Sequence, residues 1–341
     1  MRPFQFARAE DNKAAIAAHG AQGRDDAGAI NAPSQYLAGG TTLIDLMKLD
    51  VMQPSRVVDI NALQKTNSGK IEFSEKGLRL GAMARMSQAA DHDDVRKNFP
   101  VIAQALQLAA SAQIRNMASL GGNVLQRTRC TYFRDTSYPN CNKRNPGSGC
   151  AAVDGINRAH AVLGTSEDCI AAYPGDFAQA LLALDAQVEI DGPRGARTIP
   201  FASLHQPPGK TPHVETTLAP GDLIIAFNIP AVPWAKRSLF LKIRDRESYE
   251  FALASAAVAL ELDNGNVKQV RIALGGVATM PWRAKEAEAA LQGKAGDDAT
   301  VKAAADAAFA QAQPRQHNAF KVELGKRTLI RALHQAAALE I

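Results

Sequence analysis

The four cysteines of the chain lie within one 40-residue segment, and the rest of the sequence contains none. They are Cys130, Cys141, Cys150 and Cys169, with the spacing C-x10-C-x8-C-x18-C. Four thiolates can ligate an iron–sulfur cluster, hold zinc or pair as two disulfides. Structural zinc sites usually contain close C-x2-4-C pairs, which this spacing lacks. The spacing alone leaves these three possibilities open, together with four unrelated thiols.

The segment around the cysteines is basic and irregular. Its cations are Arg127, Arg129, Arg134, Lys143, Arg144 and Arg158. They would stabilise the net negative charge of a four-thiolate cluster, although a solvated basic loop has the same composition. Residues that break helices and central strands occur at Pro139, Pro146, Gly147 and Gly149. A long loop that contains four cysteines predicts a functional segment.

Two glycine-rich turns precede the cysteines. The first is Leu37-Ala38-Gly39-Gly40-Thr41-Thr42-Leu43, and the second is Ser119-Leu120-Gly121-Gly122-Asn123. A strand that enters a helix through glycines lets backbone N–H groups approach a phosphate closely. Neither turn matches G-x-G-x-x-G or the phosphate loop of nucleoside triphosphatases, and each by itself is also typical of an ordinary turn.

Length and composition indicate a globular protein of two or three domains, with 341 residues, 46% hydrophobic and 21% charged. The net charge of +5 comes without a run of five or six Lys or Arg, so we expect no nucleic-acid partner. No apolar stretch reaches 18 residues, which predicts no membrane span. The first residues lack the apolar core of a signal peptide. We therefore expect the chain to stay in the cytoplasm unless a partner carries a signal.

The elements that must position these residues alternate between helix and strand in the first 60 residues. Before the cysteines we expect helices at 11–19, 43–49, 87–99 and 101–112, and strands at 36–38, 57–60, 71–73 and 78–80. After them we expect a helix at 176–184, strands at 188–190, 198–199 and 223–229, and a linker at 230–234. Strands at 240–243, 251–262 and 267–275 then predict an antiparallel sheet, followed by helices at 283–291, 299–312 and 318–339.

Five motifs follow one another along the chain. They are A-G-G-T-T-L at 38–43, S-L-G-G-N at 119–123, G-D-F at 175–177, D-L-I-I at 222–225 leading to Ile229-Pro230, and F-L-K-I-R at 240–244. Each motif is weak by itself. In this order they resemble the FAD-binding subunits of the molybdenum hydroxylase (xanthine dehydrogenase) family, collinearly from about residue 1 to residue 341.

This resemblance implies an α+β fold in two domains. Residues 1–230 would form a two-lobed α/β FAD-binding domain of the PCMH type, with an insertion at about 126–173. Residues 235–341 would form a small antiparallel sheet with helices, of the CO dehydrogenase flavoprotein C-terminal type. The cofactor of the subunit would be FAD, and no catalytic side chain is expected on this chain.

The resemblance also implies which residues bind FAD. The backbone of Leu37, Ala38, Gly39, Gly40, Thr41, Thr42 and Leu43 would cradle the pyrophosphate, and Ser119, Gly122 and Asn123 would take the other phosphate face or the ribityl chain. Asp176 would accept from the ribose or adenine side, although Asp is also a common helix N-cap. Ile224 would contact the adenine through its backbone, although a strand core has the same residue. Lys242 would lie near the isoalloxazine, where a cation stabilises reduced flavin, although a solvated lysine is the alternative.

The insertion resembles the one in flavin subunits of bacterial periplasmic aldehyde oxidoreductases, which holds a 4Fe–4S cluster. The resemblance implies Cys130, Cys141, Cys150 and Cys169 as its four thiolate ligands. We expect the nearby aromatic residues to pack around the cofactors and exclude water; they are Tyr132, Phe133, Tyr138 and Tyr173. The flavin subunit of 4-hydroxybenzoyl-CoA reductase carries such a cluster with its cysteines placed differently.

The function implied is electron transfer within a heterotrimer. A large molybdopterin subunit would oxidise an aldehyde, a small subunit with two 2Fe–2S clusters would pass the electrons on, and this chain would deliver them through FAD to an external acceptor such as oxygen. We expect export to the periplasm with a signal-bearing partner, with the cytoplasm as the alternative. Two other functions remain open: an aromatic acyl-CoA reductase subunit of the 4-hydroxybenzoyl-CoA reductase type, and a non-redox scaffold in which the cysteines hold zinc.

Overall fold

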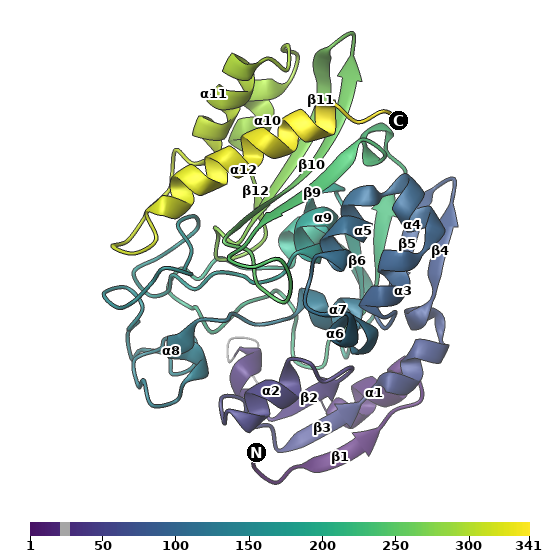
Figure 1. Ribbon diagram of the computed structural model, residues 1–341. Helices are drawn as coiled ribbons and strands as arrows, with labels where there is room; N and C mark the ends of the chain where they lie inside the picture. The colour runs from purple at the N-terminus through teal and green to yellow at the C-terminus, as the bar shows by residue number, and fades with distance from the viewer. Residues whose placement is uncertain (21–27) are drawn as a thin grey trace.

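The computed structural model describes residues 1–20 and 28–341. Its first lobe is a βαβ unit at the N-terminal end of the molecule (Figure 1). The strands β1 (Gln5–Arg8) and β2 (Ser34–Leu37) pair in parallel with the central β3 (Arg56–Asp59). Helix α1 (Asn12–His19) begins where the Asp11 carboxylate accepts from the Ala14 N–H at 2.7 Å, and helix α2 (Leu43–Lys48) follows the first glycine turn.

The second lobe is built on a five-stranded antiparallel sheet. Its order is β4 (Ile71–Ser74), β5 (Gly77–Gly81), β8 (Leu223–Pro230), β6 (Gln187–Asp191) and β7 (Arg197–Pro200). Short helices cover it: α3 (Met86–Asp91), α4 (Asp93–Asn98), α5 (Pro100–Gln107), α6 (Ala112–Met117), α7 (Leu120–Val124) and α9 (Phe177–Ala183). The prediction of one helix at 87–99 is wrong, because the backbone is extended at His92 and Asp93 starts a new helix.

The C-terminal domain is a four-stranded antiparallel sheet with helices on one face. The strand order is β12 (Trp282–Arg283), β11 (Asn266–Gly275), β10 (Ala254–Asp263) and β9 (Ser238–Ile243). Helices α10 (Lys285–Leu291), α11 (Asp298–Ala308) and α12 (Phe320–Ala337) follow. Strand β10 is buried on both faces, since Ala257 and Ala259 pack into the core of the second lobe while Val258 packs against the helices.

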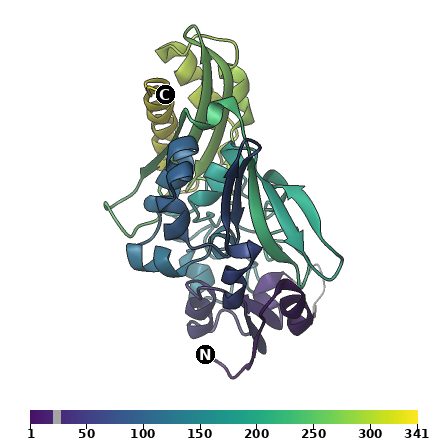
Figure 2. The same ribbon diagram turned by 90° about the vertical axis from the view of Figure 1, so that its right-hand side faces the viewer.

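The cysteine segment at 126–173 is irregular apart from one short helix, α8 (Thr131–Arg134). It lies beside the end of the C-terminal domain where helix α12 begins (Figure 1). The first lobe and the helices of the C-terminal domain lie at opposite ends of the molecule (Figure 2). Its end is fixed by the buried Lys321 of α12, whose ammonium donates to the carbonyls of Ala159, His160 and Gly276 at 2.7–3.1 Å. Asn318 donates to the carbonyl of Ala161 at 3.0 Å. The expected irregular loop is therefore confirmed, and contacts from outside it hold it in place.

The predicted α+β class, with mixed helices and strands followed by a small C-terminal antiparallel sheet, is confirmed. Among the described residues, no helix is both long enough and apolar enough to cross a membrane.

Candidate cofactor sites

A large open cleft is lined by residues of the first two lobes, and its space of about 1610 Å³ includes the solvent at its mouth. Ligand sites are commonly clefts that combine apolar walls with a few polar groups. Both glycine turns line this cleft. Of the predicted FAD residues, those that line the cleft are Ala38, Gly39, Gly40, Thr41, Thr42, Leu43, Ser119, Gly122 and Ile224.

The first glycine turn is shaped by close backbone contact with the second lobe. A Cβ atom on Gly39 would lie 2.0 Å from the carbonyl oxygen of Met117, so only glycine allows this approach. Gly40 has φ of +75°, a left-handed conformation that glycine adopts without strain. Leu37 is the last residue of β2 and packs in the core of the first lobe rather than lining the cleft.

The second glycine turn opens helix α7. Ser119 is its N-cap and accepts from the Gly122 N–H at 3.2 Å, while the Gly121 N–H donates to the carbonyl of Ala82 at 2.8 Å. Asn123 does not line the cleft. Its side-chain amide donates instead to the Met86 sulfur at 3.4 Å. These contacts fix the turn against the sheet of the second lobe.

Asp176 and Lys242 lie away from the cleft lining and pair with each other. Their Oδ2 and Nζ atoms are 2.6 Å apart, and both side chains are almost completely buried. Lys242 also donates to the carbonyl of Leu108 at 3.1 Å. Burial raises the pKa of Asp176, which Lys242 opposes. The structure thus brings together two residues 66 positions apart that were predicted separately as FAD contacts, and their contact with FAD stays a prediction.

The cleft has a polar end that the sequence did not single out. Tyr36 lines it and donates to the carbonyl of Gly221 at 2.8 Å. Asp222 also lines it, and its buried carboxylate accepts from Arg197 at 2.5 Å and from the Ala219 N–H at 2.7 Å. Asp222 stands two residues before the predicted contact Ile224, and this position in the D-L-I-I motif was the available signal. Its side chain is fully buried, and both of its oxygens accept from Arg197, so the carboxylate fixes this end of the cleft.

All four cysteines line one small cavity of about 280 Å³, together with Lys143. The thiols are free, and none is paired as a disulfide. The His160 Nε2 lies 3.1 Å from the Cys130 sulfur. Burial raises the pKa of Cys130 to about 12 and that of Cys169 to about 11. Buried thiols of this kind become thiolates when a metal centre compensates their charge, so the donor set suits an iron–sulfur cluster.

The positions of the four thiols can be compared with those needed for a zinc site. Within residues 1–20 and 28–341, no group of three or more His, Cys, Asp or Glu side chains converges closely enough to hold a single metal ion. The four cysteines thus line one cavity without converging on a site for a single ion. Of the aromatic residues predicted near the cofactors, Tyr132 and Phe133 line the cysteine cavity, Tyr173 lines the next cavity, and Tyr138 is partly exposed.

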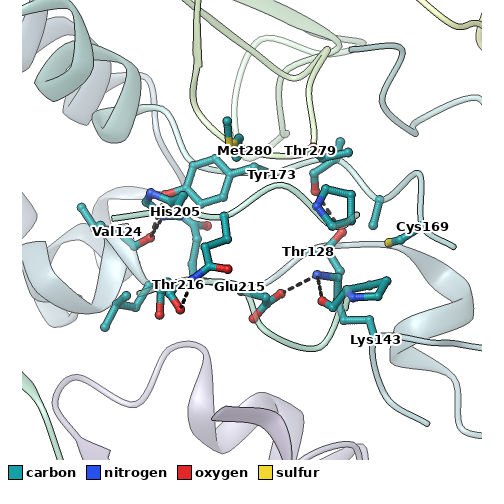
Figure 3. Close-up of a pocket in the computed structure, with 17 residues that line it drawn as sticks. Val124, Thr128, Lys143, Cys169, Tyr173, His205, Glu215, Thr216, Thr279 and Met280 are labelled. Carbon is teal, nitrogen blue, oxygen red and sulfur yellow. Dashed lines mark hydrogen bonds and ion pairs between the residues drawn. The ribbon is translucent and has the colours of Figure 1, made fainter. Parts of the chain in front are cut away.

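A third cavity has lining residues in common with each of the other two, and Figure 3 shows its lining. It shares Lys143 and Cys169 with the cysteine cavity, and Leu125, Glu215 and Thr216 with the large cleft. The Glu215 carboxylate accepts from Lys143 at 2.9 Å and from Arg127. The cysteine segment indicated both cations, but no sequence signal pointed to Glu215. This residue lies 72 positions beyond Lys143, in a loop without a motif.

Comparison with known proteins agrees with this arrangement. The family model for the FAD binding domain in molybdopterin dehydrogenase matches residues 2–232, and that for the CO dehydrogenase flavoprotein C-terminal domain matches residues 240–336. The chain therefore belongs to the FAD-binding subunits of the molybdenum hydroxylase family, and the family predicted from its motifs is confirmed. It is an oxidoreductase subunit that binds FAD.

Individual relatives are similar to the chain over most of its length. The chain is 47% identical over 307 residues to the aldehyde oxidoreductase FAD-binding subunit PaoB of Escherichia coli (strain K12), covering 89% of this chain and 92% of that subunit. It is 26% identical to the carbon monoxide dehydrogenase medium chain of Hydrogenophaga pseudoflava, covering 91% and 92%. A solved structure of carbon monoxide dehydrogenase from that organism superposes with a TM-score of 0.73 at 25% identity, covering 99% and 98%.

Proposed function

We propose that this chain is the flavin subunit of a molybdenum-containing aldehyde oxidoreductase, and that it passes electrons from partner subunits through FAD to an external acceptor such as oxygen. The observation that carries this proposal is the large cleft lined by both glycine turns, in a chain 47% identical to an aldehyde oxidoreductase FAD-binding subunit. The partners are a large subunit with the molybdenum cofactor and a small subunit with 2Fe–2S clusters. Relatives named as medium chains support such an assembly.

The chain's own residues bind and orient the flavin. The backbone of the two glycine turns would hold the pyrophosphate, because both turns line the cleft and each leads into a helix whose first N–H groups are potential donors. Asp222 would act indirectly, by holding Arg197 and the Ala219 N–H at the polar end of the cleft. FAD, when bound, supplies the capacity to take up two electrons and release them singly or as a pair. The walls of the cleft would exclude water from part of the surface of the bound flavin.

A 4Fe–4S cluster held by Cys130, Cys141, Cys150 and Cys169 is the second part of the proposal. Three features support it: all four sulfurs line one cavity, the thiols are unpaired, and the buried cation Lys143 lies beside them. The cluster would extend the electron path from FAD or tune it. We also propose that the assembled complex is exported to the periplasm with a signal-bearing partner.

The test is an anaerobic absorption spectrum of the purified chain, with iron, sulfide, zinc and flavin assayed on the same sample. We expect flavin bands over a broad iron–sulfur shoulder, with about four irons and one FAD per chain. Replacing Cys150 by Ser should remove the shoulder and keep the flavin bands. Zinc without flavin would replace the proposal with a structural scaffold, and flavin without iron would overturn its cluster part.

Turnover by the whole complex tests the reaction. We expect oxidation of an aldehyde with reduction of oxygen. Reduction of an aromatic acyl-CoA by the same complex, with no aldehyde oxidation, would assign it to the 4-hydroxybenzoyl-CoA reductase type. Fractionation of cells that produce all partners tests the location, and recovery of the complex in the cytoplasm alone would refute export.

A further inference from the structure

Three charged side chains, two buried and one partly exposed, form a chain between the large cleft and the cysteine cavity. Arg127 lines the cleft, Lys143 lines the cysteine cavity, and Glu215 lies between them and pairs with both. Arg127 and Lys143 are each only 9% exposed. Figure 3 shows Lys143 directed at Glu215, with Cys169 beyond it. We call these three residues the ionic bridge.

The ionic bridge is costly for the fold to maintain. Burying charges away from water is unfavourable, and a buried ion pair often stabilises a protein no more than apolar residues would. Lys143 has a second fixed contact, since its ammonium donates to the carbonyl of Pro212 at 2.9 Å. A charge held in this way between two cavities therefore suggests a role outside folding.

The field of Lys143 reaches the cysteines. Lys143 and Cys169 line the cysteine cavity together and also line the third cavity together, so the ammonium and this sulfur border the same small spaces. The Glu215 carboxylate accepts from the same ammonium at 2.9 Å and offsets part of its positive charge. In a buried site such interactions are screened far less than on the surface.

We propose that Lys143 and Glu215 set the reduction potential of the cluster in the cysteine cavity, and that Glu215 extends the same electrostatic control to FAD. Adding one electron to the cluster adds one negative charge, which Lys143 stabilises and Glu215 disfavours. Within the ionic bridge, Arg127 and Glu215 line the large cleft, whereas Lys143 does not. Lys143 therefore acts mainly on the cluster. This inference rests on the cluster and flavin proposed above.

The experiment is a mediated redox titration of the purified complex with dithionite as the electron donor, followed by electron paramagnetic resonance for the cluster and absorbance for the flavin. For Lys143→Met we expect the ratio of reduced to oxidised cluster at a fixed potential to fall about tenfold, a shift of about 59 mV to lower potential for one electron. For Glu215→Gln we expect both cluster and flavin potentials to rise. Lys143→Arg keeps the charge and should restore the cluster potential.

Lys210→Met is the matched control. Lys210 lies 3.1 Å from Asp168, next to Cys169 in the chain, but its side chain is 88% exposed. Solvent and salt screen such a charge, so this variant should leave both potentials unchanged.

The outcomes separate this inference from the proposal on which it rests. A wild-type complex without iron refutes the cluster itself. A wild-type complex with iron, together with Lys143→Met and Glu215→Gln variants that keep the wild-type potentials, overturns the role of the ionic bridge alone. If Lys143→Met fails to load iron, Glu215→Gln decides, because an unchanged cluster potential in that variant overturns the inference.

Discussion

Replacing Gly39 by Ala tests whether the two glycine turns together form the flavin site. The added Cβ would lie 2.0 Å from the Met117 carbonyl oxygen and 2.7 Å from its carbonyl carbon. Ordinary contact begins at 3.4 Å, so the first turn and the end of α6 must separate by about 1.4 Å. Both contacts are with backbone atoms, which cannot rotate away as the end of a side chain can.

The size of the effect follows from this overlap. Forcing one extra methyl group into a packed site costs about 1–3 kcal/mol. The first turn lines the cleft, and Met117 lies two residues before Ser119 of the second turn, so their separation displaces the donors that would hold the pyrophosphate. If the whole cost falls on binding, the dissociation constant for FAD rises about 5- to 150-fold.

The assay is calorimetric titration of the deflavinated protein with FAD, with thermal unfolding of the same samples. Gly296→Ala is the matched control, since its Cβ would meet no atom closer than 3.9 Å. We expect weaker FAD binding for Gly39→Ala and wild-type binding for Gly296→Ala. A Gly39→Ala variant that binds FAD as tightly as the wild type would refute the reasoning.

Three further predictions concern stability. Lys321→Met should lower the free energy of unfolding by about 1–3 kcal/mol, because three buried carbonyls lose their donor, whereas Lys326→Met on the same helix should change it little; equal melting temperatures would contradict this. Asp176→Asn should cost about 3 kcal/mol by leaving Lys242 without a charged partner, and chemical denaturation with a double-mutant cycle measures the coupling. Burial raises the pKa of Asp185, but hydrogen bonds and charges from two arginines lower it more, so the folded state favours the carboxylate. Its contribution is complete above the ordinary carboxyl pKa of about 3.9 and is lost as the pH falls through the lower pKa of the folded state. The stability difference between wild type and Asp185→Asn, measured by denaturation across pH, should therefore shrink in acid; a constant difference would contradict it.

Local residue types were sufficient to predict the two glycine turns that line the large cleft. Gly39 and Gly40 mark a turn that needs close backbone approach, and Ser119 caps the helix of the second turn. The order of these motifs predicted the family, which the matches over residues 2–232 and 240–336 confirm. The alternation of strands and turns after residue 235 likewise predicted the antiparallel sheet. The glycine turns, the helix cap and the strands each depend on residues within about one turn or strand of each other.

The pairing of distant side chains was not predictable in this way. Asp176 and Lys242 were both noted, yet nothing in their spacing showed that they meet at 2.6 Å. Glu215 lies in a loop without a motif, and only the packing of that loop against the cysteine segment brings it to Lys143. Carboxylates and lysines are common on protein surfaces, so their residue type alone does not indicate burial.

The sequence by itself therefore determined three features of this protein: the two glycine turns, the clustered cysteines and the order of the domains. These depend on steric rules and side-chain chemistry that act over a few residues, and a chain carries them wherever it folds. The tertiary structure alone decided that four cysteines spread over 40 residues face one cavity and that a buried ionic bridge joins this cavity to the flavin cleft. Such contacts arise from the packing of segments far apart in the chain, which no local pattern specifies.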